Sequence, residues 1–406
     1  MTKKKVLIIG INSPPELTGI GRYSGEMVAW LAAHDYEVTM ITAFPYYPQW
    51  KVQKPYSGWW YKKESPAANI ILYRCPMYVP SKPTGLKRML HEATFFMSAF
   101  FVILKLLFRP GYNSMLAIAP PFHLGFLALF YKFFKGTPVL YHLQDLQVDA
   151  AKDLGVLKAG WLFSLLFKLE RSILNKADTI TTISEGMQKK ISRKVDRTVL
   201  LFPNWVDTAS YYPMTNRKLL KARWGFSAED KIVMYSGSIG EKQGLEMLLA
   251  IAARLEQRSA IKFVICGTGP LKNKLMSVAE TAGVKNVFFL PLQEHAVFNE
   301  FLNMADVHLV LQKGDAGDLM MPSKLTTILS VGGLAIVTAA SGTTLSEVIT
   351  SNHMGFVVPA DSEVTLEDMI VHSCENEHSA LRLNARAYAE RYLNKDVILS
   401  NLTSAL

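Results

Sequence analysis

The chain has 406 residues, half of them apolar, which is too long for one ordinary hydrophobic core and suits two α/β domains. Its three cysteines, Cys75, Cys266 and Cys374, are far apart and offer neither a zinc-binding spacing nor a disulfide framework. A reducing cytoplasm fits this pattern.

The net charge of +10 is uneven along the chain. Residues 1–205 hold 26 Lys and Arg against 13 Asp and Glu, whereas residues 206–406 hold 18 against 21. A basic first half attracts nucleic acid, anionic lipid or a phosphorylated substrate. The sequence has no RRM-like aromatic motif and no arginine-rich arm, so we expect no nucleic-acid partner.

The first predicted element is a strand. Residues 1–10 carry three lysines, but the apolar run Val6–Ile9 is too short for a signal peptide and indicates a buried strand. A helical pattern follows over 20–33, and short β-branched runs then alternate with amphipathic stretches. This alternation predicts a largely parallel sheet covered on both faces. After Asn204 a second series has its strands in KIVMYSG, IKFVICG, NVFFLP, DVHLVLQ and LAIVTA.

Two doubly wound, Rossmann-like α/β domains in tandem are therefore predicted. The segment FPNWVDTASYYP at 202–213 has two prolines and an asparagine and suits a short connection. We place the first domain at 1–205 and the second at 206–385. We expect residues 386–406 to form a helical tail that packs back across the interdomain region.

One stretch, FFMSAFFVILKLLF at 95–108, is nearly all apolar and has basic residues on both sides. It is shorter than the about 20 residues that a membrane-spanning helix needs. A buried core helix and a helix lying in the membrane interface, with its basic flanks on anionic headgroups, both stay open. The apolar segments 126–134 and 161–167 favour peripheral association with an anionic membrane surface, on its cytoplasmic side.

Glycine-rich loops follow predicted strands, at the edge where open α/β sheets bind ligands. In the first domain, PELTGIGRYSGEM places Gly19, Gly21 and Gly25 around Arg22 at the expected start of a helix. A tight turn that binds nothing gives the same pattern. The spacing departs from the dinucleotide fingerprint, which argues against a nicotinamide-dependent dehydrogenase.

The second domain has two such loops and a further cation. YSGSIGEKQGLEMLL has glycines around Lys242 and Gln243, and VICGTGPLKNKL has two glycines ahead of a helix. In MMPSKLTTILSVGG the hydroxyl of Ser323 is a potential N-cap, and Lys324 is aimed at the same crevice. A diphosphate would find these cations and main-chain amides converging. A solvated surface lysine is the alternative for Lys324.

The motifs PELTGIGRYSGEM, LFPNWVD, YSGSIGEKQGLE and PSKLTTIL, in this order over essentially the whole chain, resemble family 4 glycosyltransferases. The resemblance is to exopolysaccharide glycosyltransferases of the colanic-acid type, for which fucosyl transfer is the usual assignment. It implies a GT-B architecture, with two Rossmann-like domains facing each other across a cleft, and a retaining, metal-independent transfer. It also implies that the second domain binds the donor and the first domain the acceptor.

The resemblance assigns the donor diphosphate to loops of the second domain. Many relatives have an arginine where Ser238 stands and a lysine where Gln243 stands, so Lys242 is the nearest cation here. Asp318 lies beside the position of the first of two family glutamates and is a candidate substitute. The expected donor-binding residues are Ser238, Lys242, Gln243, Gly267, Gly269, Asp318, Pro322, Ser323, Lys324 and Leu325.

In the first domain, the strand-end histidine common in the family corresponds to Gln144, which is followed by Asp145. We expect Asp145 to orient the acceptor hydroxyl and Gln144 to hydrogen-bond the transferred sugar, with a helix cap as the equal alternative for Asp145. For His142 on the same strand, the alternative is a structural role. For Glu16 and Arg22 in the first loop, the alternative is a charge that makes no functional contact. The expected acceptor-binding residues are Glu16, Gly19, Gly21, Arg22 and His142.

No Asp-x-Asp pair occurs in the sequence to carry a magnesium diphosphate. We therefore expect no metal and no cofactor, with leaving-group charge met by Lys324, Lys242 and main-chain N–H groups. The predicted reaction moves a hexosyl group from a GDP- or UDP-linked sugar to a polyprenyl-diphosphate-linked glycan. The alternative is a non-catalytic nucleotide-sugar-binding scaffold of a membrane polysaccharide assembly complex.

Overall fold

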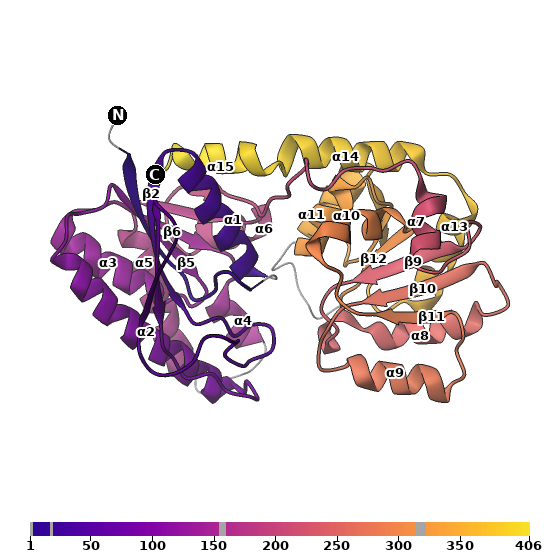
Figure 1. The fold of residues 1–406 in the computed structure, drawn as a ribbon, viewed down its shortest axis with the longest axis horizontal. Coiled ribbons are helices and arrows are strands. Elements are labelled where there is room, and N and C mark those ends of the chain that lie inside the picture. Colours follow the sequence, from indigo (N-terminus) through magenta and orange to yellow (C-terminus); the bar gives the residue numbers. More distant parts are fainter. Residues whose placement is uncertain (1–2, 17–18, 154–159, 314–321) are drawn as a thin grey trace. The chain divides into compact units, whose positions relative to one another are not determined.

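The computed structural model describes residues 3–16, 19–153, 160–313 and 322–406. The chain forms two compact units: unit 1 comprises Met1–Pro203 with Leu399–Leu406, and unit 2 comprises Asn204–Ile398. Each unit is a sheet flanked by helices, with the Rossmann-like alternation of strands and helices (Figure 1). The predicted α/β class is confirmed.

Unit 1 is built on an eight-stranded sheet of order β3-β4-β2-β1-β5-β6-β7-β8. Neighbouring strands are parallel except for the edge pair β3 and β4. The strands are β1 (Lys4–Ile9), β2 (Tyr36–Ala43), β3 (Lys62–Ala67), β4 (Ile70–Cys75), β5 (Ser114–Ala119), β6 (Val139–Leu143), β7 (Thr179–Thr182) and β8 (Val199–Leu201). The helices are α1 (Ile20–Ala33), α2 (Gly85–Leu107), α3 (Leu124–Lys135), α4 (Gln147–Asp153), α5 (Gly160–Lys176) and α6 (Glu185–Ser192).

The first strand is central in unit 1, as its composition predicts. Residues Val6–Ile9 are fully buried, because β1 pairs with β2 on one side and β5 on the other. The run VLII is apolar throughout, rather than at alternate positions, since helices cover both faces of a parallel sheet. The lysines before it stay exposed at the start of the strand.

Helix α2 is longer than the apolar run at 95–108, because the helix begins already at Gly85. By length and composition alone its 23 residues are enough to cross a membrane, which corrects the expectation of a helix too short to span. One face of the helix, which includes Phe95, Ala99 and Ile103, is nevertheless buried, and α2 packs on α3, β2 and β4. The helix is therefore part of the core of unit 1.

Unit 2 is built on a six-stranded parallel sheet of order β11-β10-β9-β12-β13-β14. Its strands are β9 (Lys231–Ser236), β10 (Ile261–Cys266), β11 (Val287–Leu290), β12 (Val307–Val310), β13 (Ala335–Thr338) and β14 (Gly355–Val358). The helices are α7 (Arg217–Arg223), η1 (Glu241–Gln243), α8 (Leu245–Arg254), α9 (Lys272–Thr281), α10 (His295–Asn303), α11 (Ser323–Ser330), α12 (Thr344–Ser351), α13 (Glu363–Glu375), α14 (Ser379–Tyr392) and α15 (Lys395–Thr403). The five strands predicted after Asn204 correspond to β9 to β13.

Alternate residues of each strand in unit 2 enter two different hydrophobic clusters. In β9, Ile232 and Met234 belong to one cluster, whereas Val233 and Tyr235 belong to the other. The two clusters lie on opposite faces of the sheet, since successive side chains of a strand point in opposite directions. Both faces are therefore buried, which explains the continuous apolar runs in the sequence.

One guanidinium fixes helix α14 to the start of unit 2. Arg386 donates to the carbonyl oxygens of Ser330 (2.7 Å), Tyr211 (2.8 Å) and Thr208 (3.1 Å). Three main-chain carbonyls from two separate segments thus share one charged donor. Arg386 also pairs with Glu390, one turn further along α14 (2.7 Å).

Arg386→Ala is expected to lower the free energy of unfolding by about 2–4 kcal/mol, because three carbonyl groups lose a charge-assisted hydrogen bond. Urea denaturation followed by far-UV circular dichroism measures the change. Glu390→Ala is the matched control, since it removes only a half-exposed ion pair and is expected to cost less than about 0.5 kcal/mol. Equal destabilisation by the two substitutions would contradict the anchoring role.

Candidate functional site

The strand order of unit 2 changes direction between β9 and β12. From β9 the chain proceeds to β10 and β11 on one side, then returns to β12 on the other side of β9. In open α/β sheets, ligands bind outside the carboxyl ends of the two strands at such a point. Gly237 directly follows β9, and Lys313 lies three residues beyond the end of β12. This edge of unit 2 is therefore the expected location of a ligand-binding site.

The turn after β9 packs main chain to main chain on the turn after β10. The Gly237 N–H donates to the Cys266 carbonyl (2.9 Å). A Cβ atom at Gly267 would lie 1.9 Å from the carbonyl oxygen of Gly237, and one at Gly269 would lie 2.1 Å from that of Ile239. Only glycine permits this approach, so the two glycines after β10 fix the shape of the turn after β9.

Lys324 brings a buried ammonium group to the same turn. It lies in the first turn of α11, and its Nζ is 3.8 Å from the centroid of the Tyr235 ring. The same Nζ would lie 3.4 Å from a Cβ atom added at Gly237. The residue as a whole is half-buried, but Nζ itself is buried and has no hydrogen-bond partner among the described residues. Burial lowers the pKa of Lys324 to about 7. The aromatic face of Tyr235 offsets part of the cost of burying the charge.

The start of α11 corrects the role predicted for Ser323. Pro322 is the N-cap residue and Ser323 is the first helical residue, without a side-chain capping bond, so the helix begins one residue earlier than a serine cap requires. Leu325 has a buried side chain, and its N–H donates to the Pro322 carbonyl (2.9 Å). Asp318 lies outside the described residues.

The side chain of Gln243 is engaged within its own loop. Its Oε1 accepts a hydrogen bond from the Gly240 N–H (3.1 Å) and so closes the turn η1. Ser238 is exposed, and its carbonyl oxygen accepts a hydrogen bond from the Tyr235 hydroxyl (2.6 Å). The serine hydroxyl lies at the surface of the turn, whereas the glutamine oxygen contributes to the shape of the loop.

Lys242 lies on the adjoining turn η1 and is exposed. Its carbonyl oxygen accepts a hydrogen bond from the Lys313 N–H (2.9 Å), which ties η1 to the segment after β12. The structure thus brings Lys324, Gly237 and Gly267 together, and joins Lys242 to this edge through its main chain. The sequence motifs did not indicate Lys313. Its position just after a strand, at the change in strand order, is the feature that could have indicated it.

In unit 1, the structure gives Glu16 internal partners. Its carboxylate accepts hydrogen bonds from the N–H groups of Tyr46 (2.8 Å) and Tyr47 (2.9 Å) and from the Asn12 side chain (2.8 Å). Burial raises the pKa of Glu16, while these hydrogen bonds and the charge of Arg74 oppose the rise. Glu16 therefore shapes the loop after β1, and the acceptor contact expected of it stays a prediction.

The glycine loop around Arg22 is also explained by packing. A Cβ atom at Gly21 would lie 2.8 Å from Glu16, so the buried carboxylate requires glycine there. Gly19 is the N-cap residue of α1 with a positive φ of 61°. Arg22 forms an ion pair with Glu26 one turn along α1 (2.7 Å) and is half-buried.

The end of β6 places two of the predicted residues at different depths. His142 is buried, its Nδ1 lies 2.9 Å from Thr181 Oγ1, and burial lowers the pKa of the ring to about 3. This neutral, buried ring favours the structural alternative over contact with an acceptor. Gln144 is buried just beyond the strand, and Asp145 is half-buried between β6 and α4.

A polar network that the sequence did not reveal supports this loop. Gln147, the first residue of α4, donates to both carboxylate oxygens of Glu92 in α2 (2.9 and 2.8 Å). Its Oε1 accepts a hydrogen bond from the Phe122 N–H (3.0 Å). The network fixes the chain two residues after Asp145. No local sequence pattern predicts this network, because Glu92 is 55 positions away from Gln147 in the sequence.

Two family models match the chain in sequence. The model described as glycosyl transferases group 1 matches residues 216–391, and the glycosyl transferase 4-like domain matches residues 18–205. A relative named as a glycosyl transferase of colanic acid biosynthesis, WcaI of Escherichia coli (strain K12), is 40% identical over 97% of this chain and 98% of its own. A second relative, named as the glycosyltransferase EpsD of Bacillus subtilis (strain 168), is 24% identical over 44% of this chain and 45% of its own.

Solved structures show the same fold at low identity. The sucrose-phosphate synthase of Thermosynechococcus elongatus superposes with a TM-score of 0.76 at 15% identity, over 99% of this chain and 98% of its own. Anabaena HepE, solved in complex with UDP-glucose, gives a TM-score of 0.68 at 14% identity, over 99% of this chain and 100% of its own. These likenesses confirm the GT-B fold. With the family models and the 40% identical relative, they show that the chain belongs to the group 1 glycosyltransferases.

Proposed function

We propose that this glycosyltransferase moves a hexosyl group, with fucosyl as the candidate, from a nucleoside-diphosphate sugar to a lipid-linked glycan. The pathway is the synthesis of a colanic-acid-like exopolysaccharide, in keeping with the name of the Escherichia coli relative. The transfer is retaining and needs no metal. The complex of HepE with UDP-glucose supports a nucleotide-sugar donor.

The observation that carries the proposal is the buried ammonium of Lys324 beside the Gly237 turn. Without an anion, burial favours its neutral form, so the group is poised to gain charge when a diphosphate binds. Lys324 lies in the first turn of α11, and the start of a helix carries a partial positive charge. Together these groups stabilise the negative charge that develops on the leaving diphosphate.

On the acceptor side, Asp145 orients the attacking hydroxyl and Gln144 hydrogen-bonds the transferred sugar. The half-buried position of Asp145 is compatible with contact to a substrate. The Glu92–Gln147 network supports this role, because it holds the chain on the far side of Asp145 in one geometry. Asp145 and Gln144 remain the proposed catalytic pair.

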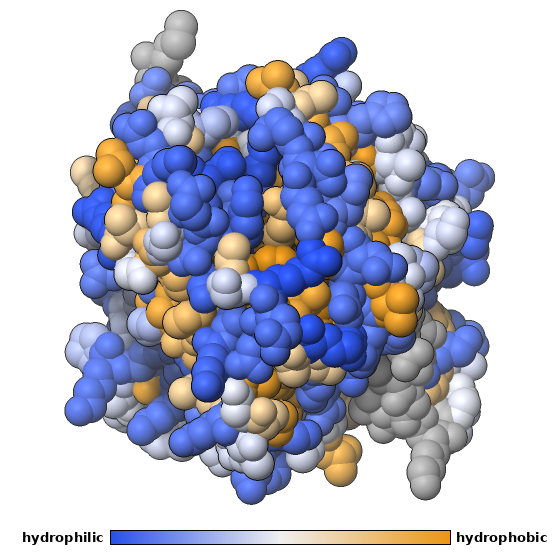
Figure 2. Space-filling model, turned by 90° about the vertical axis from the view of Figure 1, so that its right-hand side faces the viewer, coloured by the Kyte–Doolittle hydropathy of each residue, from blue (hydrophilic) through white to orange (hydrophobic). Residues whose placement is uncertain are grey.

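Exposed apolar side chains are unevenly distributed, which supports docking of unit 1 on a membrane. Among the described residues, every exposed tryptophan and phenylalanine belongs to unit 1. Along α2 the exposed residues Leu90, Met97 and Phe101 recur at helical spacing and form an apolar stripe, opposite the buried face. The face of the molecule in Figure 2 is, by contrast, mostly hydrophilic, with hydrophobic residues in small separate groups.

Aromatic residues of α3 extend this apolar stripe. Phe100 of α2 contacts Phe130 of α3, with ring centroids 5.3 Å apart, and Phe133 and Phe134 follow on α3, both exposed. Basic residues accompany the stripe, since residues 49–110 hold ten Lys and Arg against two Asp and Glu. Apolar side chains within basic surroundings suit the cytoplasmic surface of an anionic membrane.

Lys324→Ala is expected to slow transfer about tenfold to a hundredfold, since a charge-assisted hydrogen bond contributes about 1.5–3 kcal/mol. The donor is first chosen by a thermal-shift screen of GDP, UDP and their sugars. Product formation with that donor is then measured with and without EDTA, and NMR of the product's anomeric proton reports the stereochemistry.

Lys313→Ala is the matched control for the rate, because Lys313 is exposed and lies at the same edge. We expect it to slow transfer several-fold less than Lys324→Ala does. Unchanged turnover of the Lys324 variant would remove this residue from the site. Loss of transfer in EDTA, restored by a divalent metal, would overturn the metal-free mechanism.

Donor binding is expected to be linked to proton uptake, because the pKa of Lys324 is lowered to about 7 in the free protein. Above that pH the ammonium is largely neutral and takes up a proton when the diphosphate binds, so affinity falls as pH rises. Titration calorimetry at pH 8 in two buffers of different ionisation enthalpy should show about 0.5–0.9 proton taken up per nucleoside diphosphate. Lys324→Met should abolish the uptake, and an equal uptake in this variant would refute the assignment.

Phe101→Glu is expected to weaken binding to vesicles with anionic lipid about tenfold, because it places a like charge in the centre of the apolar stripe. Co-sedimentation at low and moderate salt measures the binding. Leu219→Glu is the matched control, since Leu219 is also apolar and exposed but belongs to unit 2. Equal binding by both variants would show that α2 does not meet the lipid.

A further inference from the structure

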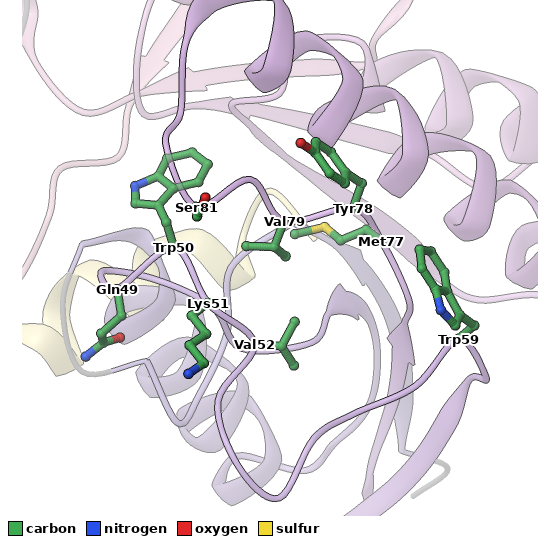
Figure 3. A pocket seen from close by; sticks show the side chains of 9 residues that line it. All are labelled: Gln49, Trp50, Lys51, Val52, Trp59, Met77, Tyr78, Val79 and Ser81. Atoms are coloured by element: carbon green, nitrogen blue, oxygen red, sulfur yellow. The ribbon is translucent and has the colours of Figure 1, made fainter.

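Unit 1 contains a cavity of about 530 Å³ at the carboxyl ends of two strands. One wall comes from the loop after β2 and the other from the segment after β4, and these strands are parallel neighbours in the sheet. The cavity thus opens on the sheet edge where parallel α/β structures bind ligands. Its lining residues are Gln49, Trp50, Lys51, Val52, Trp59, Met77, Tyr78, Val79 and Ser81 (Figure 3).

The lining is largely apolar and contains no carboxylate. Val52, Met77 and Val79 lie between Trp50 and Trp59, which stand on opposite sides in this view (Figure 3). The only charged side chain among the lining residues is the exposed Lys51. Gln49, Lys51, Tyr78 and Ser81 bring polar groups to the lining, but most of the exposed lining is apolar, so an apolar chain matches these walls.

Trp50 forms a wall that is held in place. Its ring lies 5.5 Å from that of Tyr46 and 5.2 Å from that of His91, between ring centroids. The Arg88 guanidinium lies 5.7 Å from the ring centroid. The main chain at Trp50 has a φ of 51°, which side-chain-bearing residues rarely adopt. The loop thus pays a conformational cost to present this residue.

The segment 49–110, which supplies all the lining residues, is strongly basic in sequence. The two acidic residues of segment 49–110 are already engaged, since Glu64 pairs with Arg74 (2.9 Å) and Glu92 binds Gln147. The basic excess of the segment, to which Lys51 belongs, is therefore not neutralised from within it. The cavity combines a largely apolar interior with Lys51 in its lining and with Arg88 against the Trp50 ring, which is complementary to an apolar chain carrying an anionic head.

The rim also adjoins the apolar stripe of α2. The hydroxyl of Tyr61, two residues after Trp59, donates to the Ser98 carbonyl in α2 (3.0 Å). Ser98 is the neighbour of Met97 in that stripe, and Trp59 itself is 75% exposed. A lipid at a membrane on which this stripe docks would therefore reach the cavity without crossing water.

We propose that this cavity holds the chain segment next to the phosphate of the acceptor's carrier lipid, with Lys51 at the phosphate. The assignment rests on the proposed function, whose acceptor it makes specific. In the sheet, β2 is three strand positions from β6, or about 14 Å at the usual spacing. A phosphate at the rim would leave the attached glycan free to extend along the same edge towards Gln144 and Asp145.

Farnesyl phosphate, used below its micellar concentration with the full chain, is the probe, and titration calorimetry measures its Kd. Trp59→Ala is expected to weaken binding about tenfold through loss of apolar contact. Lys51→Ala is expected to weaken it about fivefold through loss of one charge. Trp60→Ala is the matched control, because Trp60 is adjacent and 84% exposed but does not line the cavity, and it should leave Kd unchanged.

Equal effects of Trp59→Ala and Trp60→Ala would overturn the assignment, since they would indicate adsorption on exposed indoles. Competition by inorganic phosphate at the same concentration would overturn it too, because the head alone would then be recognised. Dihexanoyl phosphatidylglycerol that binds more tightly than farnesyl phosphate would identify a bulk lipid instead of the carrier.

The thermal shift with nucleotide sugar separates this inference from the proposed function. If the tryptophan-specific farnesyl phosphate binding holds but no donor is bound or consumed, the proposed reaction fails and the lipid site stands. If transfer is observed but Trp59→Ala leaves both Kd for the probe and KM for a lipid-linked acceptor unchanged, the lipid site alone fails.

Discussion

The unpartnered ammonium of Lys324 is the constraint on which the candidate site of unit 2 depends. A buried cation is tolerated only if something offsets its lost hydration, and in the described structure the ring of Tyr235 does so in part. Nζ lies beside the Gly237 turn, and the missing side chain at Gly267 allows that turn to approach the turn after β10. An anion that completes this arrangement would find its counter-charge and its main-chain donors already in position.

Much of the fold could be predicted, because both faces of each sheet are covered and the strands are therefore uninterrupted apolar runs. The glycine loops at Gly237 and Gly267 were visible for a related reason, because they directly follow β9 and β10. The finer roles depended on single-residue details. Pro322 starts α11 one position early and so removes the capping role of Ser323, and Gln243 turns its oxygen back to Gly240. Neither detail has a signature in the local sequence.

In unit 1 the partners of an isolated charge cannot be read from the sequence. Glu16 follows the first strand, where a ligand contact is plausible, yet the chain returns 30 residues later and buries it under the N–H groups of Tyr46 and Tyr47. The network of Glu92 and Gln147 spans 55 positions. Such contacts are set by which loops the sheet order brings together, and no periodic pattern records them.

The apolar stripe of α2 and the basic residues around it act at different distances. At physiological salt the attraction of lysine and arginine for an anionic surface extends about 8 Å, whereas apolar side chains gain free energy only once water has left the contact. Charge would therefore bring unit 1 to a membrane before Met97 and Phe101 enter it. Met97 and Phe101 are about half exposed, so burial of their remaining apolar surface would add to the binding free energy only at contact with an apolar phase. The same helix carries Glu92, so the surface that would meet lipid and the loop that carries Asp145 share one rigid element.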